Sequence, residues 1–226
     1  MLTRESIRSG AVRRIAAEQG LMRILSDEEL TASLGGLLHG ADLSTGVWVF
    51  AYGSLIWNPA FHFTDRVVGR VFGFHRRFCL WTHLGRGCPE RPGLTLGLER
   101  GGSCLGVAYH IAADAALEEL DIVWRREMLG DAYVPRWVAV RTPLATVRAI
   151  TFTINRAHER YVRDLSDEAA AAAIARASGF LGPCADYLIN TVDHLAALGI
   201  HDRPLERLRD RVLARAAAPP QADQAT

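Results

Sequence analysis

Residues 47–59 read VWVFAYGSLIWNP, and this stretch decides how the rest of the chain is interpreted. Its first four residues are apolar and either β-branched or aromatic, which is typical of a short strand buried on both faces. Gly53 allows a sharp turn directly after this strand, and Asn58-Pro59 marks the end of the turn. Such a turn presents backbone N–H groups that no strand pairing uses, so it can hold a carboxylate or an oxyanion. The alternative is a buried strand followed by an ordinary turn.

The composition argues against nucleic-acid and membrane partners. The chain has 226 residues, of which 49% are hydrophobic, and its net charge is +1. All 26 basic residues are arginine, and they are scattered among 25 acidic residues, so no strong positive field is expected to attract nucleic acid or anionic lipid. No apolar run approaches the roughly 20 residues that span a bilayer, and the first residues lack the apolar core of a secretory signal.

The four cysteines indicate neither a disulfide framework nor a zinc site. Cys79, Cys88, Cys104 and Cys184 are widely spaced, and no Cys-x-x-Cys or Cys/His ligand spacing is present. Reduced and mostly buried thiols are the expectation, and these are typical of a cytoplasmic protein.

The remaining sequence divides into a helical extension, a strand-rich domain and a polar tail. Residues 1–44 are expected to form a peripheral helical cover without chemistry: one helix over 6–25 and a second opened by the capping box of Ser26 and Glu29. Residues 45–217 form the main domain, and residues 218–226 are expected to be disordered. In this domain we predict strands over 47–50, 66–81, 94–98, 103–111, 137–141 and 148–154, a loop over 84–93, a hairpin turn over 99–102, and helices over 112–128, 166–177, 185–198 and 203–217.

The order of these elements favours an α+β fold. The strands are central, one helix separates two of them, and the other helices flank both ends. Because strands and helices do not alternate regularly, a mixed or closed sheet with helices packed outside fits better than a doubly wound parallel sheet.

The second informative stretch contains Glu127, near the end of the helix predicted over 112–128. Its neighbours Trp124 and Met128 are large and apolar, and a carboxylate in such surroundings has a raised pKa and is a better base. The alternative is a surface glutamate paired with Arg125 or Arg126. Glu118, nine residues earlier, is expected to be a surface or supporting residue.

The ordered set of motifs resembles the ChaC-type γ-glutamylcyclotransferases over roughly residues 47–215. The shared motifs are Tyr52-Gly53-Ser54-Leu55 with Trp57-Asn58-Pro59, Arg77-Phe78, Pro92-Gly93-Leu94, Gly102-x-x-x-Gly106-Val107-Ala108-Tyr109, Arg126-Glu127, Tyr133, and the helix within residues 186–202. The resemblance implies a small closed β-barrel with peripheral helices. It also implies cyclisation of a γ-glutamyl group to 5-oxoproline, with glutathione as the usual substrate and Cys-Gly as the other product.

The resemblance also suggests the site residues. Glu127 is the expected general base and then acid, and Tyr133 is a substrate-orienting hydroxyl. The γ-glutamyl pocket is expected to be lined by Val49, Phe50, Ala51, Tyr52, Gly53, Ser54 and Leu55. A single carboxylate and a turn of backbone amides suffice for this chemistry, so no metal or cofactor is expected. Arg77 is expected to be solvated or, alternatively, to lie near a substrate carboxylate.

Two other functions stay open from the sequence. The first is a cyclotransferase that acts on other γ-glutamyl amines or γ-glutamyl amino acids. The second is a non-catalytic regulator of cation transport, although a pure binding module does not need a base at position 127. The sequence makes no prediction about the oligomeric state.

Overall fold

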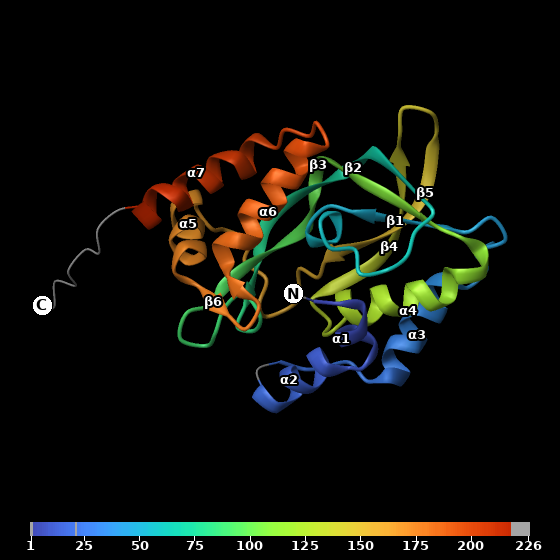
Figure 1. The fold of residues 1–226 in the computed structure, drawn as a ribbon, viewed down its shortest axis with the longest axis horizontal. Coiled ribbons are helices and arrows are strands. Elements are labelled where there is room, and N and C mark those ends of the chain that lie inside the picture. The colour runs from blue at the N-terminus through green and yellow to red at the C-terminus, as the bar shows by residue number, and fades with distance from the viewer. Residues whose placement is uncertain (1, 21, 218–226) are drawn as a thin grey trace, which may run out of the picture.

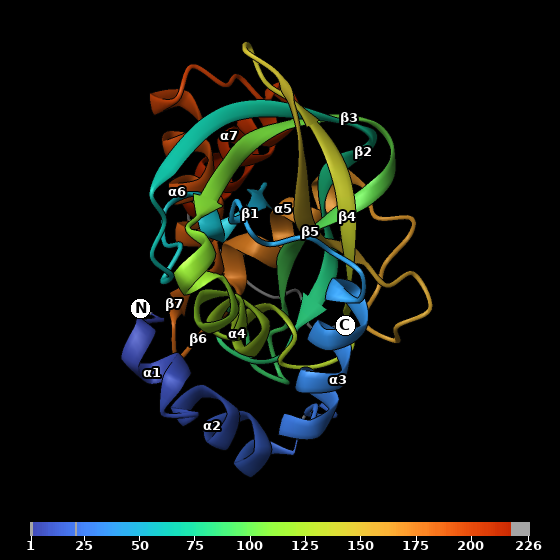
Figure 2. The same cartoon turned by 90° about the vertical axis from the view of Figure 1, so that its right-hand side faces the viewer.

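A closed five-stranded barrel forms the centre of the computed structural model, which describes residues 2–20 and 22–217 (Figures 1 and 2). The predicted disordered tail lies outside the described residues. The strands follow the order β1-β3-β2-β4-β5 around the barrel, and β1 closes it by pairing in parallel with β5. The strands are β1 (Val47–Ala51), β2 (Asp65–Thr82), β3 (Gly93–Ile111), β4 (Tyr133–Arg141) and β5 (Thr146–Ile154).

Strands β2 and β3 form one long antiparallel ribbon, and here the predicted hairpin over 99–102 is wrong. The two strands pair from Asp65 opposite His110 to Thr82 opposite Gly93, so the chain reverses in the loop over 83–92. Gly101 and Gly102 have φ angles of 105° and 66°, and they lie where the register shifts opposite Gly73. The glycine pair therefore makes a bulge that bends the ribbon rather than a turn that ends it.

Strand β1 is buried on both faces, as its sequence predicts. Val49, Phe50 and Ala51 have no exposed surface, because β1 pairs with β3 and β5 within the barrel wall and its side chains join the hydrophobic core. Helix α4 (Ala116–Glu127) connects β3 to β4 and packs Trp124 edge-on against Phe152 of β5, with ring centroids 5.1 Å apart. This contact fixes the end of α4 beside the barrel.

The other helices form two groups at opposite ends of the barrel (Figure 1). One group contains α4 with α1 (Arg4–Arg8), α2 (Ala11–Gln19) and α3 (Asp27–Leu38). The other contains α5 (Asp167–Arg176), α6 (Cys184–Ala197) and α7 (Arg203–Ala217). Short elements complete the described chain: the 3-10 turns η1 (Ser54–Ile56) and η2 (Ala113–Ala115), and the two-residue strands β6 (Ser178–Gly179) and β7 (Gly182–Pro183).

The predicted helix caps are confirmed, but the first predicted helix is wrong. Ser26 and Ser166 each accept a hydrogen bond from the backbone N–H three residues later, at the starts of α3 and α5. The helix expected over 6–25 is divided at Gly10, which has a φ of 68°, and it stops at Gly20, which has a φ of 62°. Glycine favours this left-handed conformation, so the chain bends where a continuous helix would continue.

Within the described residues, no helix is long and apolar enough to cross a membrane.

We predict that Gly106 is required for the close approach of β3 to β1. A Cβ atom at this position would lie 2.3 Å from the Ala51 carbonyl oxygen and 2.7 Å from Cζ of Phe50. Gly106→Ala should therefore lower the free energy of unfolding by about 1–3 kcal/mol, measured by urea denaturation.

The matched control is Gly36→Ala in α3, where a Cβ atom would meet nothing within 4 Å. This change should leave stability unchanged or increase it by about 0.5–1 kcal/mol, because alanine favours helix. Equal unfolding midpoints for the two variants would contradict the packing argument.

Candidate active site

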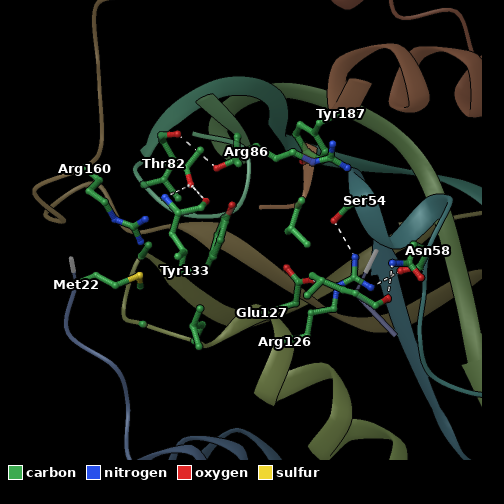
Figure 3. Close-up of a pocket in the computed structure, with 18 of the residues that line it drawn as sticks. Met22, Ser54, Asn58, Thr82, Arg86, Arg126, Glu127, Tyr133, Arg160 and Tyr187 are labelled. Atoms are coloured by element: carbon green, nitrogen blue, oxygen red, sulfur yellow. Dashed lines mark hydrogen bonds and ion pairs between the residues drawn. The ribbon is translucent and has the colours of Figure 1, made fainter. Parts of the chain in front are cut away.

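The C-terminal end of α4 and the turn after β1 face one another across a cavity (Figure 3). The cavity has a volume of about 220 Å³, and a smaller pocket of about 30 Å³ adjoins it, because Ser54, Glu127, Tyr133 and Tyr187 line both. The other residues lining the small pocket are Phe50, Tyr52, Gly53, Leu55, Leu96 and Phe152. The barrel strands therefore supply the floor of the small pocket, and strand ends, loops and helices together line the larger cavity.

Glu127 is paired with its neighbour Arg126 at the centre of this site. Nε of Arg126 lies 3.1 Å from Oε1 of Glu127, and the two side chains are only 3% and 16% exposed. The same guanidinium donates hydrogen bonds to Ser54 Oγ at 3.0 Å and to the Asn58 carbonyl oxygen. Arg126 thus connects the acid at the end of α4 to both ends of the turn that follows β1.

Burial dominates the electrostatics of the carboxyl group. Desolvation raises the pKa of Glu127 above its ordinary value, and the charge of Arg126 and its hydrogen bond act in the opposite direction. A carboxylate with a raised pKa is a stronger base than a solvated one, and it can also return a proton near neutral pH. The pair therefore has the properties of a general acid–base group.

Three tyrosines surround the carboxyl group, and two of them are held by backbone carbonyls. The Tyr52 hydroxyl donates to the Phe152 carbonyl at 2.8 Å, and the Tyr133 hydroxyl donates to the Leu96 carbonyl at 2.7 Å. Burial raises the pKa of Tyr52, Tyr133 and Tyr187, so these hydroxyls stay protonated at neutral pH. Each can orient a substrate as a neutral polar group.

The turn after β1 leaves backbone amides available. Among the described residues, no hydrogen bond is donated by the N–H groups of Gly53, Ser54 and Leu55, whereas the following Ile56 amide bonds to the Gly53 carbonyl. Gly53 also permits a close approach of α6, because a Cβ atom there would lie 3.2 Å from the Tyr187 hydroxyl oxygen. These N–H groups can donate hydrogen bonds to a carboxylate or an oxyanion in the cavity.

The structure brings most of the predicted site residues to one place. Glu127, Tyr133, Phe50, Tyr52, Gly53, Ser54 and Leu55 all line the small pocket. Val49 and Ala51 are fully buried in β1 and line neither cavity. The proposed alternative for Arg77 is wrong: its guanidinium pairs with Glu99 and donates to the carbonyls of Val162 and Arg163, outside both cavities.

Several residues of the site were not identified from the sequence. Arg126 is adjacent to Glu127, but adjacency did not indicate that its side chain turns inward while Arg125 pairs with Asp121 and Asp27. Tyr187 lies in the helix predicted over 185–198, where its spacing indicates only a packing role. Leu2 and Met22, from the extension expected to carry no chemistry, line the larger cavity. Within the described residues, no group of three or more His, Cys, Asp or Glu side chains is arranged to hold a metal ion.

Comparisons with known proteins identify the family. The family model described as ChaC-like protein matches residues 47–215. This chain belongs to the ChaC-like family. Among curated proteins, the chain is 39% identical over 194 residues to the glutathione-specific γ-glutamylcyclotransferase of Escherichia coli K12, covering 85% of this chain and 83% of the relative. It is 31% identical to the mouse glutathione-specific γ-glutamylcyclotransferase 1, covering 74% of this chain and 78% of the relative.

A solved structure confirms the ChaC-like fold. The crystal structure of a yeast γ-glutamyl cyclotransferase specific to glutathione superposes with a TM-score of 0.70 at 22% identity. The match covers 76% of this chain and 98% of the yeast chain. The prediction of a closed mixed barrel with peripheral helices is therefore confirmed.

We predict that Arg126 limits the pKa rise of Glu127 in this ChaC-family protein. Arg126→Met removes the positive charge and the hydrogen bond that both lower the pKa of the carboxyl group, so its pKa should rise further. The measurement is a pH titration of carboxyl-labelled glutamate by ¹³C NMR, in which Glu127→Gln identifies the signal. A titration midpoint that stays in place or falls would show that Arg126 does not stabilise the ionised carboxylate.

Proposed function

We propose that this ChaC-family protein is a γ-glutamylcyclotransferase that cleaves glutathione to 5-oxoproline and Cys-Gly. The observation that carries the proposal is the buried Glu127 carboxylate, which shares a pocket with the unpaired amides of residues 53–55. The names of the bacterial and mouse relatives, which specify glutathione, support the choice of substrate.

The chemistry follows from what each group can do. The α-amine of the γ-glutamyl group is the nucleophile, and it must lose a proton because its ordinary pKa is about 7.7–8.0. Glu127 accepts this proton, and the amine nitrogen then attacks the γ-carbonyl carbon of the same residue. The resulting oxyanion is stabilised by the amides of the turn at residues 53–55. The bond to the leaving nitrogen breaks as Glu127 returns the proton to that nitrogen. The ring nitrogen then loses its second proton through Glu127 to the released amine, so no water is consumed.

Positioning supplies much of the rate because the reaction is intramolecular. The γ-glutamyl chain must be held folded back on itself, with the amine close to its own carbonyl carbon. The small pocket restricts the space beside Glu127, and Tyr52 and Tyr133 supply fixed hydroxyl groups along its wall. Val49 and Ala51 do not line the pocket, and we propose that they act by packing β1, the strand that directly precedes Tyr52.

A cyclotransferase with other γ-glutamyl substrates is the second candidate. The larger cavity favours glutathione, because it extends beyond the small pocket and is lined by Arg86 and Arg160, which suit an anionic leaving group better than a simple amine. A non-catalytic regulator of cation transport is the third candidate, and it gives no reason to bury an ionisable acid at a cost in stability. A panel of glutathione, γ-glutamyl amino acids and γ-glutamyl amines separates the first two, since each predicts a different preferred substrate.

The same proposal includes the cellular setting. The four cysteines are free thiols, and three of them, Cys79, Cys104 and Cys184, are buried. Free thiols and a thiol-containing substrate both suit a reducing compartment, so we propose a cytoplasmic location. Neither nucleic acid nor a membrane is part of the proposed activity.

We predict that Glu127→Gln abolishes turnover of glutathione while the fold survives. Glutamine keeps the shape of the side chain and removes its basicity, so kcat should fall by about 10²–10⁴-fold. The assay measures Cys-Gly and 5-oxoproline released by purified protein without added metal, and circular dichroism checks the fold.

Glu118→Gln is the matched control. Glu118 lies on the same helix, its side chain is 60% exposed, and it pairs at the surface with Arg4 and Arg8. This variant should keep the kcat of the wild type. Normal turnover by Glu127→Gln would remove Glu127 from the mechanism, whereas a wild type that releases neither product would refute the proposed function.

A further inference from the structure

Arg160 lines the larger cavity and forms no ion pair within the described residues. It lies between β5 and α5, in a segment that is fixed to β2 by a bridge between Tyr161 and Leu80 and by the Trp81 amide, which donates to the Arg160 carbonyl at 2.9 Å. Among the ion pairs of the described residues, none includes Arg160. Hydrogen bonds to β2 therefore fix the backbone at Arg160, whereas its guanidinium can still pair with a ligand.

The hydrogen bonding of this guanidinium is also incomplete. Its Nη1 lies 3.4 Å from the Trp81 carbonyl, which is a weak contact, and its buried Nε has no hydrogen-bond partner within the described residues. Burial lowers the pKa of Arg160, and the charges of Glu159 and Asp131 offset only part of this effect. A buried donor without a partner destabilises the protein, and a bound anion would remove this cost.

The side chains that line the larger cavity carry an excess of positive charge. They belong to Arg86, Arg126, Glu127 and Arg160, and Glu127 already pairs with Arg126. Two arginines therefore remain without an acidic partner in the cavity. Nη1 of Arg86 donates a hydrogen bond to the Pro183 carbonyl at 3.0 Å. Nε of Arg160, in contrast, has no hydrogen-bond partner within the described residues.

The position of Arg160 matches the far end of a γ-glutamyl peptide. Figure 3 shows Arg160 entering from the opposite side of the cavity to Glu127, with Tyr133 between them. Apolar side chains form the walls between these polar ends, among them Leu80, Leu84, Leu129 and Leu181. A substrate that reacts beside Glu127 would extend past these walls and present its terminal group to Arg160.

We infer that Arg160 binds the C-terminal carboxylate of the leaving peptide, which is the glycine carboxylate of glutathione. An arginine–carboxylate pair gives charge-assisted, directional hydrogen bonds, so it selects substrates that carry this carboxylate two residues beyond the γ-glutamyl group. This inference rests on the proposed function, because it assigns a residue to the leaving group of that reaction. Arg160 is a binding residue and takes no part in the proton transfers.

The test compares glutathione with its glycine ethyl ester, which lacks only the carboxylate in question. Wild-type protein should show a KM for the ester about 10- to 100-fold above that for glutathione. Arg160→Gln should raise the KM for glutathione by a similar factor, change its kcat less than about twofold, and abolish the preference for the acid over the ester. Arg163→Gln, an exposed position on the same segment that lines neither cavity, should behave as wild type.

Binding to catalytically inactive protein separates this inference from the proposed function. In calorimetric titrations, Glu127→Gln should bind glutathione more tightly than the ester, and Glu127→Gln combined with Arg160→Gln should bind both equally. The melting temperature of Arg160→Gln should match or exceed that of wild type, because the substitution removes a partly buried guanidinium that has no ion pair.

Three outcomes would overturn the assignment. The first is an active Arg160→Gln variant that still prefers the acid. The second is that Arg86→Gln, rather than Arg160→Gln, loses the preference for glutathione over the ester, which would show that Arg86 binds the carboxylate. The third is a fall in kcat and melting temperature without a change in preference, which would make Arg160 structural. A wild type without glutathione turnover would instead refute the proposed function.

Discussion

The ion pair between Arg126 and Glu127 is the interaction on which the site depends. A carboxylate removed from water needs a cation nearby, and Arg126 provides it at 3.1 Å. The same guanidinium holds Ser54 and Asn58, so the charge of the acid and the position of the turn are set by one group. Because helix and turn are linked in this way, a displacement of either would disturb both the proton acceptor and the amides.

The barrel makes this arrangement possible by joining distant parts of the chain. Strand β1 delivers the turn, and β5 closes the barrel beside it, placing the Phe152 carbonyl where Tyr52 is anchored. The same Phe152 ring receives Trp124 of α4, three residues before Glu127. One strand therefore positions both halves of the site, and the rigid hydrogen-bonded sheet explains how a pocket so small can be held open.

Local sequence signals predicted local structure well. The buried strand at 47–51, the caps at Ser26 and Ser166, and the ends of the later helices depend on neighbours along the chain. The bulge at Gly101 and Gly102 was misread because positive φ angles suit a hairpin and a bulge equally, and only the pairing with β2 decides. Glu127 was found through its motif, whereas Arg126, Tyr187 and Arg160 depend on tertiary contacts that no spacing encodes.

Part of the outer wall of the cavity lies outside the region that the family model matches. Leu2 and Met22 line the cavity, yet they precede residue 47, where the match to the family model begins. The carbonyl of Leu2 accepts a hydrogen bond from the Asn58 side chain at 2.8 Å, which ties this wall to the reactive turn. The leading segment of this chain therefore helps to set the width of the entrance to the cavity, although Glu127 and the amides of the turn come from the barrel and α4.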